Sequence, residues 1–168
     1  MKIRHAKQSD AFAVACVLID SWRETYQGIF PQSLLDNLDQ ATQTQRMLAA
    51  IQMSNMLVLE NDAQQLIGFI GGGNNRQTAQ FPFIDGELYA LYVSLSAQGR
   101  GYGAKLVVAF KTLMKELGYK GLLVKCLKEN TNAQAFYQHM GFSTIGDQML
   151  TLQESSVVET VLAKSINP

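Results

Sequence analysis

Residues 87–118 read ELYALYVSLSAQGRGYGAKLVVAFKTLMKELG, and this stretch sets the organisation of the chain. It begins as an apolar strand through Val93, crosses a short polar turn and enters a loop that contains Gly99, Gly101 and Gly103. A long amphipathic helix is predicted from Ala104 onward. Because the backbone N–H groups at such a helix start point into one small space, this order of elements predicts an anion-binding loop.

The chain has 168 residues, of which 47% are hydrophobic. We therefore expect one domain, residues 1–168, with a sizeable core rather than a disordered chain. Its 14 basic and 14 acidic residues balance without clustering, which argues against nucleic acid as a partner. No apolar run has membrane-spanning length, and we expect no membrane partner and a cytoplasmic location. Cys16 and Cys126 are expected to be free core thiols.

Periodicity predicts helices over about 10–27, 31–38 and 42–53. Apolar runs at 56–60 and 65–71, joined through Asn61-Asp62, predict an antiparallel hairpin that loosens at Gly71–Gly73. Residues 74–82 are polar and predict a loop. A strand, a helix and a strand between residues 87 and 127 predict a parallel pair. A helix is predicted near 130–140. Strands predicted at 142–145 and 157–163 follow it and complete a mixed sheet.

The glycine-rich loop partly matches two nucleotide-binding motifs. The phosphate loop of nucleoside triphosphatases requires Lys-Ser or Lys-Thr after its last glycine, whereas Gly103 is followed by Ala-Lys-Leu, so no hydroxyl is available for magnesium. The dinucleotide fingerprint fits loosely as Gly99-x-Gly101-x-x-Ala104. However, residues 94–98 separate the strand from these glycines, and too little chain follows to complete a doubly wound sheet.

Two separated motifs resemble those of the GNAT superfamily of acyl-CoA-dependent N-acyltransferases. The first, Gln/Arg-x-x-Gly-x-Gly/Ala, stands here as Gln98-Gly99-Arg100-Gly101-Tyr102-Gly103. The second, Asn-x-x-Ala-x-x-x-Tyr-x-x-x-Gly-Phe, stands as the segment from Asn130 to Phe142. Two motifs in this order, a helix and a strand apart, are more specific than one loop. The resemblance also takes in Trp22…Tyr26-x-Gly28 and Pro31, and it covers most of the chain.

The resemblance implies an α/β (α+β), GNAT-like fold: a mixed, mostly antiparallel twisted sheet with a parallel, splayed central pair and flanking helices. It implies an N-acetyltransferase that moves the acetyl group of acetyl-CoA directly to a primary amine in a ternary complex, without a metal. The acceptor stays open among small amines, polyamines, amino acids, antibiotics and protein N-termini. A homodimer through the last strands is compatible with the family. A sensor that binds acyl-CoA without turnover is the alternative.

The resemblance also assigns coenzyme contacts. Backbone N–H groups of the loop would face the pyrophosphate, the side chain of Arg100 would add charge at the rim, and the strand before the loop would pair with the pantetheine arm. That strand would leave one N–H for the thioester carbonyl. Asn130 would cap its helix or bind a pantetheine amide. The expected coenzyme-binding residues are Leu91, Tyr92, Val93, Gln98, Gly99, Arg100, Gly101, Tyr102, Gly103, Ala104, Asn130 and Tyr137.

Two side chains are candidates for proton transfer. Tyr137 lies two turns after Asn130, and the resemblance implies that its hydroxyl protonates the departing thiolate; an interior packed aromatic is the alternative. Glu87 is the best carboxylate for taking the proton of the ammonium, directly or through water, and a strand-end surface charge is its alternative. Acceptor-side candidates are Trp22, Tyr26 and Tyr89, with core packing as the alternative for the first two.

Overall fold

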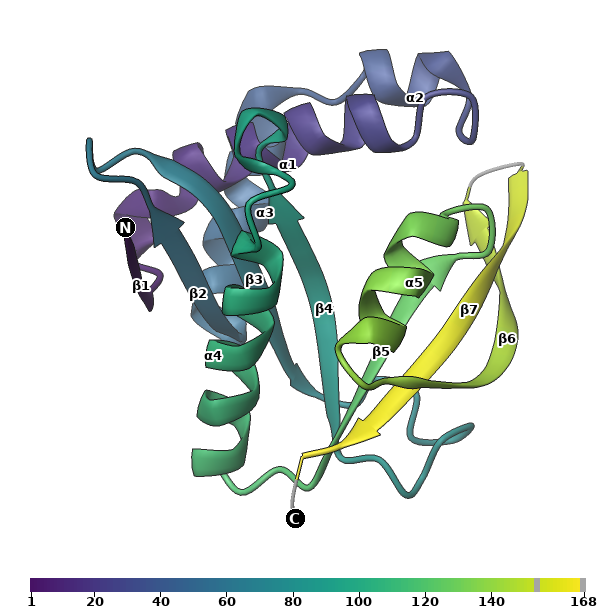
Figure 1. Cartoon of the computed structure of the whole chain (residues 1–168). Coiled ribbons are helices and arrows are strands. Elements are labelled where there is room, and N and C mark those ends of the chain that lie inside the picture. The colour runs from purple at the N-terminus through teal and green to yellow at the C-terminus, as the bar shows by residue number, and fades with distance from the viewer. Residues whose placement is uncertain (153–154, 167–168) are drawn as a thin grey trace. The chain divides into compact units, whose positions relative to one another are not determined.

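A computed structural model describes residues 1–152 and 155–166 of the chain. Figure 1 shows its helices and strands, and the chain also contains two 3₁₀ turns, η1 and η2. In chain order they are β1 (Lys2–His5), η1 (Gln8–Asp10), α1 (Ala11–Thr25), α2 (Gln32–Asp36), α3 (Gln40–Met53), β2 (Asn55–Glu60), β3 (Leu66–Asn74), β4 (Gly86–Val93), η2 (Leu95–Ala97), α4 (Tyr102–Glu116), β5 (Gly121–Leu127), α5 (Thr131–His139), β6 (Ser143–Leu152) and β7 (Ser155–Ser165).

Contacts between residues divide the chain into two compact units that share β4. The first unit consists of Met1–Gly72 and Ala90–Phe110. The second consists of Gly73–Tyr89 and the chain from Lys111 onward. The end of β4 that leads into the glycine-rich loop therefore belongs to the first unit, and the beginning of β4, with Glu87, belongs to the second.

The first unit is built on antiparallel strands covered by helices. β1 pairs with β2, and β2 pairs with β3, in the hairpin expected from the sequence. Helix α3 begins after Asp39, whose side chain accepts a hydrogen bond from the Thr42 backbone N–H at 2.7 Å, a standard N-cap. Apolar side chains of α1 and of the hairpin bury one another in a cluster made of Val14, Val17, Met56, Val58 and Phe69.

The second unit contains the parallel pair. The beginning of β4 pairs in parallel with β5, in a register that runs from Gly86↔Leu122 to Leu88↔Val124. β5 then pairs antiparallel with β7, and β7 with β6; β6 and β7 lie side by side in Figure 1. Completely or almost completely buried apolar residues on β5 and β7 form its core: Leu122, Leu123, Val124, Val161 and Leu162.

The strands follow the hydrogen-bonded order β1-β2-β3-β4-β5-β7-β6. This order, the parallel pair and the flanking helices confirm the expected mixed α/β fold. Among the residues that the structure describes, no helix has the length and apolar character needed to cross a membrane.

Two expectations about strands were wrong. β3 does not loosen at its glycines, because the ladder with β2 continues through Met56↔Gly71 and Asn55↔Gly72. The strand expected at 142–145 extends to Leu152, because β7 pairs with it along its whole length. Polar residues along β6 weaken the alternation that would have shown a longer strand.

Candidate active site

The glycine-rich loop forms a nest of unpaired backbone donors at the start of α4. Gly99 and Gly101 have φ angles of 72° and 75°, and a Cβ at either position would meet nothing within 4 Å. The left-handed backbone, not crowding, therefore requires glycine here. Among the described residues, the N–H groups of Gly99 and Gly101 donate to no other backbone group, whereas the Arg100 N–H closes the turn at Gln98 and Gly99. Free N–H groups in such a turn form an anion-binding concavity.

Hydrogen bonds anchor this loop on both sides. The Gln98 side-chain amide donates to the Val93 carbonyl at 2.9 Å, and the Gln98 backbone N–H donates to the Leu95 carbonyl at 3.1 Å. At the far side, the Lys105 N–H donates to the Gly101 carbonyl at 3.1 Å. Gln98 thus supports the loop but its own N–H is already engaged. Helix α4 begins at Tyr102, two residues earlier than expected.

The end of β4 is fixed by the side chain of Tyr92. Its hydroxyl accepts a hydrogen bond from the Trp22 indole N–H at 2.9 Å, and its ring packs against Phe69 at a centroid distance of 5.6 Å. A Cβ on Gly68 would lie 3.0 Å from the Tyr92 carbonyl oxygen. β3 therefore approaches this part of β4 so closely that a larger residue at position 68 would push against the backbone of Tyr92.

Two of the acceptor-side candidates meet in one aromatic cluster. The rings of Trp22 and Tyr26 meet edge to face at 5.1 Å, and the ring of Phe30 lies 5.9 Å from Trp22 and 5.1 Å from Tyr26. Phe30 is buried, whereas Trp22 and Tyr26 are half-buried. The cluster is therefore partly core, and it also leaves aromatic surface open to solvent. Tyr89 belongs to the second unit.

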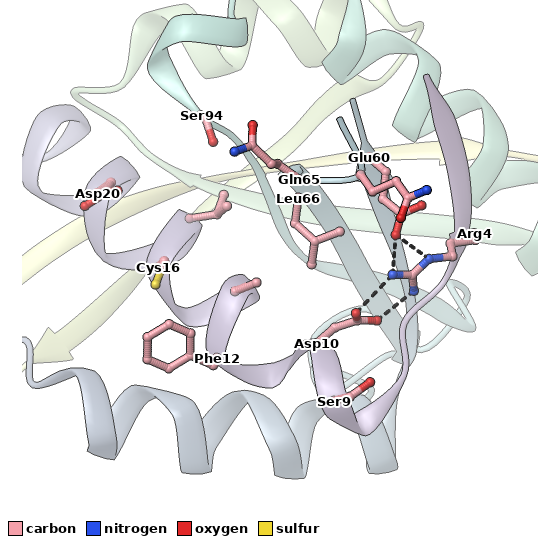
Figure 2. Close-up of a pocket in the computed structure, with 13 residues that line it drawn as sticks. Arg4, Ser9, Asp10, Phe12, Cys16, Asp20, Glu60, Gln65, Leu66 and Ser94 are labelled. Atoms are coloured by element: carbon pink, nitrogen blue, oxygen red, sulfur yellow. Dashed lines mark hydrogen bonds and ion pairs between the residues drawn. The ribbon is translucent and has the colours of Figure 1, made fainter. Parts of the chain in front are cut away.

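A cavity of about 460 Å³ in the first unit is lined by α1, the β2–β3 hairpin and Ser94. At one side of it, the guanidinium of Arg4 pairs with Asp10 at 2.7 Å and with Glu60 at 2.8 Å (Figure 2). The hydrogen bond from Arg4 holds the pKa of the Asp10 carboxyl below its usual value. None of the predicted site residues is among the residues that line this cavity. These ion pairs link β1 to η1 and to β2 at this side of the cavity.

In the second unit, the downstream motif forms a capped helix with a buried tyrosine. The side chain of Asn130 accepts a hydrogen bond from the Ala133 N–H at 3.0 Å, so Asn130 is the N-cap of α5. Tyr137 is 6% exposed. Its ring packs edgewise on Phe136 at 5.2 Å and on Phe142 at 5.6 Å. This packing fixes the direction in which the hydroxyl of Tyr137 points.

Glu87 is completely buried and paired with cations. Its carboxylate accepts hydrogen bonds from the Arg76 backbone N–H at 2.8 Å and from the Arg76 guanidinium at 2.8 and 3.3 Å. The Lys125 ammonium lies 3.6 Å away. Burial alone would raise the pKa of the Glu87 carboxyl, but the hydrogen bonds from Arg76 outweigh burial and hold this pKa below its usual value. Glu87 is therefore ionised at neutral pH.

Tyr89 stands beside this pair. The guanidinium carbon of Arg76 lies 3.8 Å from the centroid of the Tyr89 ring, a cation–π contact. The hydroxyl of Tyr89 donates to the Asn74 carbonyl at 2.6 Å. Burial raises the pKa of this phenol. The structure thus brings Glu87 and Tyr89 together through Arg76.

Sequence reasoning missed Arg76 and Lys125. Arg76 lies in the stretch expected to be a polar loop, and Lys125 interrupts an otherwise apolar strand. The charge of Lys125 within β5 is the one signal that could have indicated a buried anion nearby, because a lysine in a buried strand needs a partner.

The two cysteines are free. Burial raises the pKa of Cys126 to about 11 and also raises the pKa of Cys16. A thiol must ionise to act as a nucleophile, so neither cysteine is suited to carry an acyl group. Within residues 1–152 and 155–166, no cluster of three or more His, Cys, Asp or Glu side chains is arranged to hold a metal ion.

A model of the acetyltransferase (GNAT) family matches residues 17–142. The chain belongs to this family. An uncharacterized N-acetyltransferase of Bacillus subtilis, YuaI, is 28% identical over 136 residues, which cover 81% of this chain and 76% of the relative. Solved structures of low sequence identity share the GNAT fold, and two of them contain coenzyme A or acetyl-CoA.

The first of these is the PaiA N-acetyltransferase of Thermoplasma acidophilum in complex with coenzyme A. It is 20% identical, with a TM-score of 0.75, and 98% of each chain is covered. The second is yncA of Salmonella typhimurium with its cofactor acetyl-CoA. It is 19% identical, with a TM-score of 0.76, and the match covers 100% of this chain and 95% of yncA.

These findings confirm the GNAT resemblance, the acyltransferase class and acetyl-CoA as the donor expected of a GNAT enzyme. The individual roles of the site residues stay predictions, as does the assignment of all 168 residues to one N-acetyltransferase domain.

Proposed function

We propose that this GNAT enzyme transfers the acetyl group of acetyl-CoA directly to a primary amine while both substrates are bound. The observation that carries the proposal is the loop at the start of α4, where the N–H groups of Gly99 and Gly101 are free and both glycines have positive φ, in a chain of this family. A pyrophosphate is the anion that a helix N-terminus and a nest suit together.

The backbone of the loop, from Gln98 to Ala104, would hold the pyrophosphate of coenzyme A. Gln98 acts in support, since its N–H is engaged, while the exposed guanidinium of Arg100 adds positive charge. Leu91, Tyr92 and Val93 would pair with the pantetheine arm through their backbone groups. The Trp22–Tyr92 hydrogen bond supports this role, because it fixes the strand without using a backbone group.

Tyr137 is the proposed general acid. Its ring is held between Phe136 and Phe142, so the hydroxyl is positioned before any substrate binds. When the amine lone pair attacks the acetyl carbonyl, a strand N–H would stabilise the oxygen that gains charge. The C–S bond then breaks, and Tyr137 donates its proton to the sulfur as the thiolate leaves. Asn130, as the cap of α5, keeps this helix in place and is the proposed partner of a pantetheine amide.

Glu87 is the proposed base, and it would act through water. Its carboxylate is completely buried and already accepts hydrogen bonds from Arg76, so direct contact with an ammonium group would require Arg76 to move. Its low pKa makes it a weak base. Its proposed contribution is therefore to orient the water that takes the proton from the amine nitrogen and to stabilise the positive charge on that water. The proton that Tyr137 gives to the thiolate is then replaced from solvent.

The test is release of coenzyme A thiol from acetyl-CoA in the presence of single acceptors: aliphatic amines, polyamines, amino acids, aminoglycosides and a peptide with a free N-terminus. We expect acceptor-dependent thiol release, with initial-rate plots that intersect, as a ternary complex requires. Thiol release from none of these acceptors, together with tight acetyl-CoA binding, would overturn the proposal in favour of an acyl-CoA sensor. Parallel rate plots would overturn the direct transfer.

A cytoplasmic location and a homodimer through the last strands are part of the proposal. Cell fractionation and the mass of the protein in solution test them.

A further inference from the structure

We propose that Arg76 binds a carboxylate of the acceptor, so that the acceptor is an amine that carries a carboxylate, with free amino acids as the simplest class. This inference rests on the proposed N-acetyltransferase function and concerns the acceptor of the same reaction.

Arg76 presents one end of its guanidinium to solvent in a fixed position. Its Nε and Nη2 atoms bind the buried Glu87 carboxylate on one side, and the Tyr89 ring supports its face at 3.8 Å. The side chain is nevertheless 54% exposed. Nη1 donates to no group among the described residues. The end formed by Nη1 and Nη2 is therefore open to a ligand.

The loop that carries Arg76 is also held by hydrogen bonds. The neighbouring Asn75 is 5% exposed, and its amide donates to the carbonyls of Phe81 and Ile84 at 2.9 and 2.7 Å. Its side-chain oxygen accepts from the Gln77 N–H at 2.7 Å. The Arg76 N–H itself is bound to Glu87. A surface arginine with this support has lost most of its side-chain freedom on folding, so little more is lost when a ligand binds.

The groups in direct contact at Glu87 carry a net positive charge. Two cations, Arg76 and Lys125, face one buried carboxylate at 2.8 and 3.6 Å. Glu159 acts on Arg76 from a greater distance and offsets part of this positive charge; its carboxylate accepts a hydrogen bond from Gln148 at 2.7 Å. The planar end of a guanidinium matches a carboxylate through two parallel N–H···O bonds. A carboxylate at this end would hold the α-amine of the same molecule beside Arg76, and a water would link that amine to the buried Glu87, the proposed base.

The experiment compares L-amino acids with their carboxamides as acceptors, in thiol release from acetyl-CoA. The amide keeps the side chain and the amine but loses the carboxylate charge. Its amine is also less protonated at neutral pH, which biases the comparison against the proposal. In the wild-type enzyme we expect a higher kcat/KM for the amino acid than for its amide.

Arg76→Gln tests the residue directly. We expect the KM of the amino acid to rise by about ten- to a hundredfold, the loss of a hydrogen-bonded charge, while the KM of the amide stays unchanged. Arg76→Lys should recover part of the affinity. Lys128→Gln is the matched control, because Lys128 is 57% exposed and forms an ion pair with Asp147 at 2.6 Å. It should change neither KM.

If the wild-type enzyme has the same kcat/KM for the amides as for the amino acids, the inference is overturned and the N-acetyltransferase function still stands. An equal rise of both KM values in Arg76→Gln would do the same, since it would indicate a structural role. The wild-type comparison decides the matter even where the Arg76→Gln variant does not fold. If none of the acceptor classes gives thiol release, the proposed function itself is overturned.

Discussion

Replacing Gly101 by alanine should weaken binding of coenzyme A with little harm to the fold. Gly101 has a φ angle of 75°, and an added Cβ would meet no atom within 4 Å. The cost is therefore conformational. A left-handed backbone costs a residue with a Cβ about 1–2 kcal/mol, and alanine recovers about 0.4–1 kcal/mol by restricting the unfolded chain. A loop that kept this conformation would therefore lose about 0–1.6 kcal/mol of the free energy of unfolding, and a loop that relaxed would lose less.

Affinity should suffer more than stability. The loop can relieve the strain by turning the peptide groups at Gly101, which moves the free N–H groups of the nest out of position. Binding must then restore the strained backbone at a cost of about 1–2 kcal/mol, which corresponds to an increase of roughly five- to thirtyfold in Kd.

Calorimetry with two ligands isolates the effect. Coenzyme A contains the pyrophosphate and pantetheine does not, so Gly101→Ala should weaken the first and leave the second unchanged. Gly146→Ala is the matched control, because Gly146 also has open space around its Cβ position and is not among the glycines with positive φ. Equal losses for both ligands, or wild-type affinity for coenzyme A, would refute the argument that the nest binds the pyrophosphate.

Two further substitutions test the proposed acid and the buried carboxylate. Tyr137→Phe keeps the ring between Phe136 and Phe142 and removes the hydroxyl, so kcat should fall by about a hundredfold or more while the Kd of acetyl-CoA barely changes; unchanged turnover across pH would remove Tyr137 from the acid role. Glu87→Gln should lower the melting temperature at pH 7, where Glu87 is paired with Arg76. Since the pKa of Glu87 is lowered from 4.5 in the folded state, its stabilising effect is fully present above that pH and is lost as the pH falls through the lower folded value. The gap in melting temperature between wild type and Glu87→Gln should therefore narrow below about pH 4.5, and a constant gap down to pH 3 would contradict the pairing.

Local signals explain why much of the fold could be predicted. The expected strand at 121–127 agrees with β5 to the residue, because a nearly continuous apolar run is bounded by Gly121 and by polar residues after Leu127. Asn130 was expected to cap a helix and does so. In both cases the residues that decide the element lie within it or directly beside it.

The environment of Glu87 could not be predicted in this way. The sequence placed a carboxylate at a strand end, but its burial depends on Arg76, eleven residues earlier in a loop, and on Lys125 on another strand. Which cation reaches a carboxylate is decided by tertiary structure and leaves no local pattern. The same holds for the Trp22–Tyr92 hydrogen bond, whose partners are 70 residues apart.

The hydrogen bonds of Asn75 bear on where a reporter group can be attached to this enzyme. One buried amide binds three backbone groups of its own loop, at Gln77, Phe81 and Ile84, in addition to the loop's own backbone hydrogen bonds. Phe83, between the two carbonyls that it holds, is 99% exposed. A reporter group attached at Phe83 would therefore lie on the same loop as Arg76 and would face solvent. Fluorescence of such a labelled protein would test whether acceptor binding changes this loop, without any change to the residues proposed for chemistry.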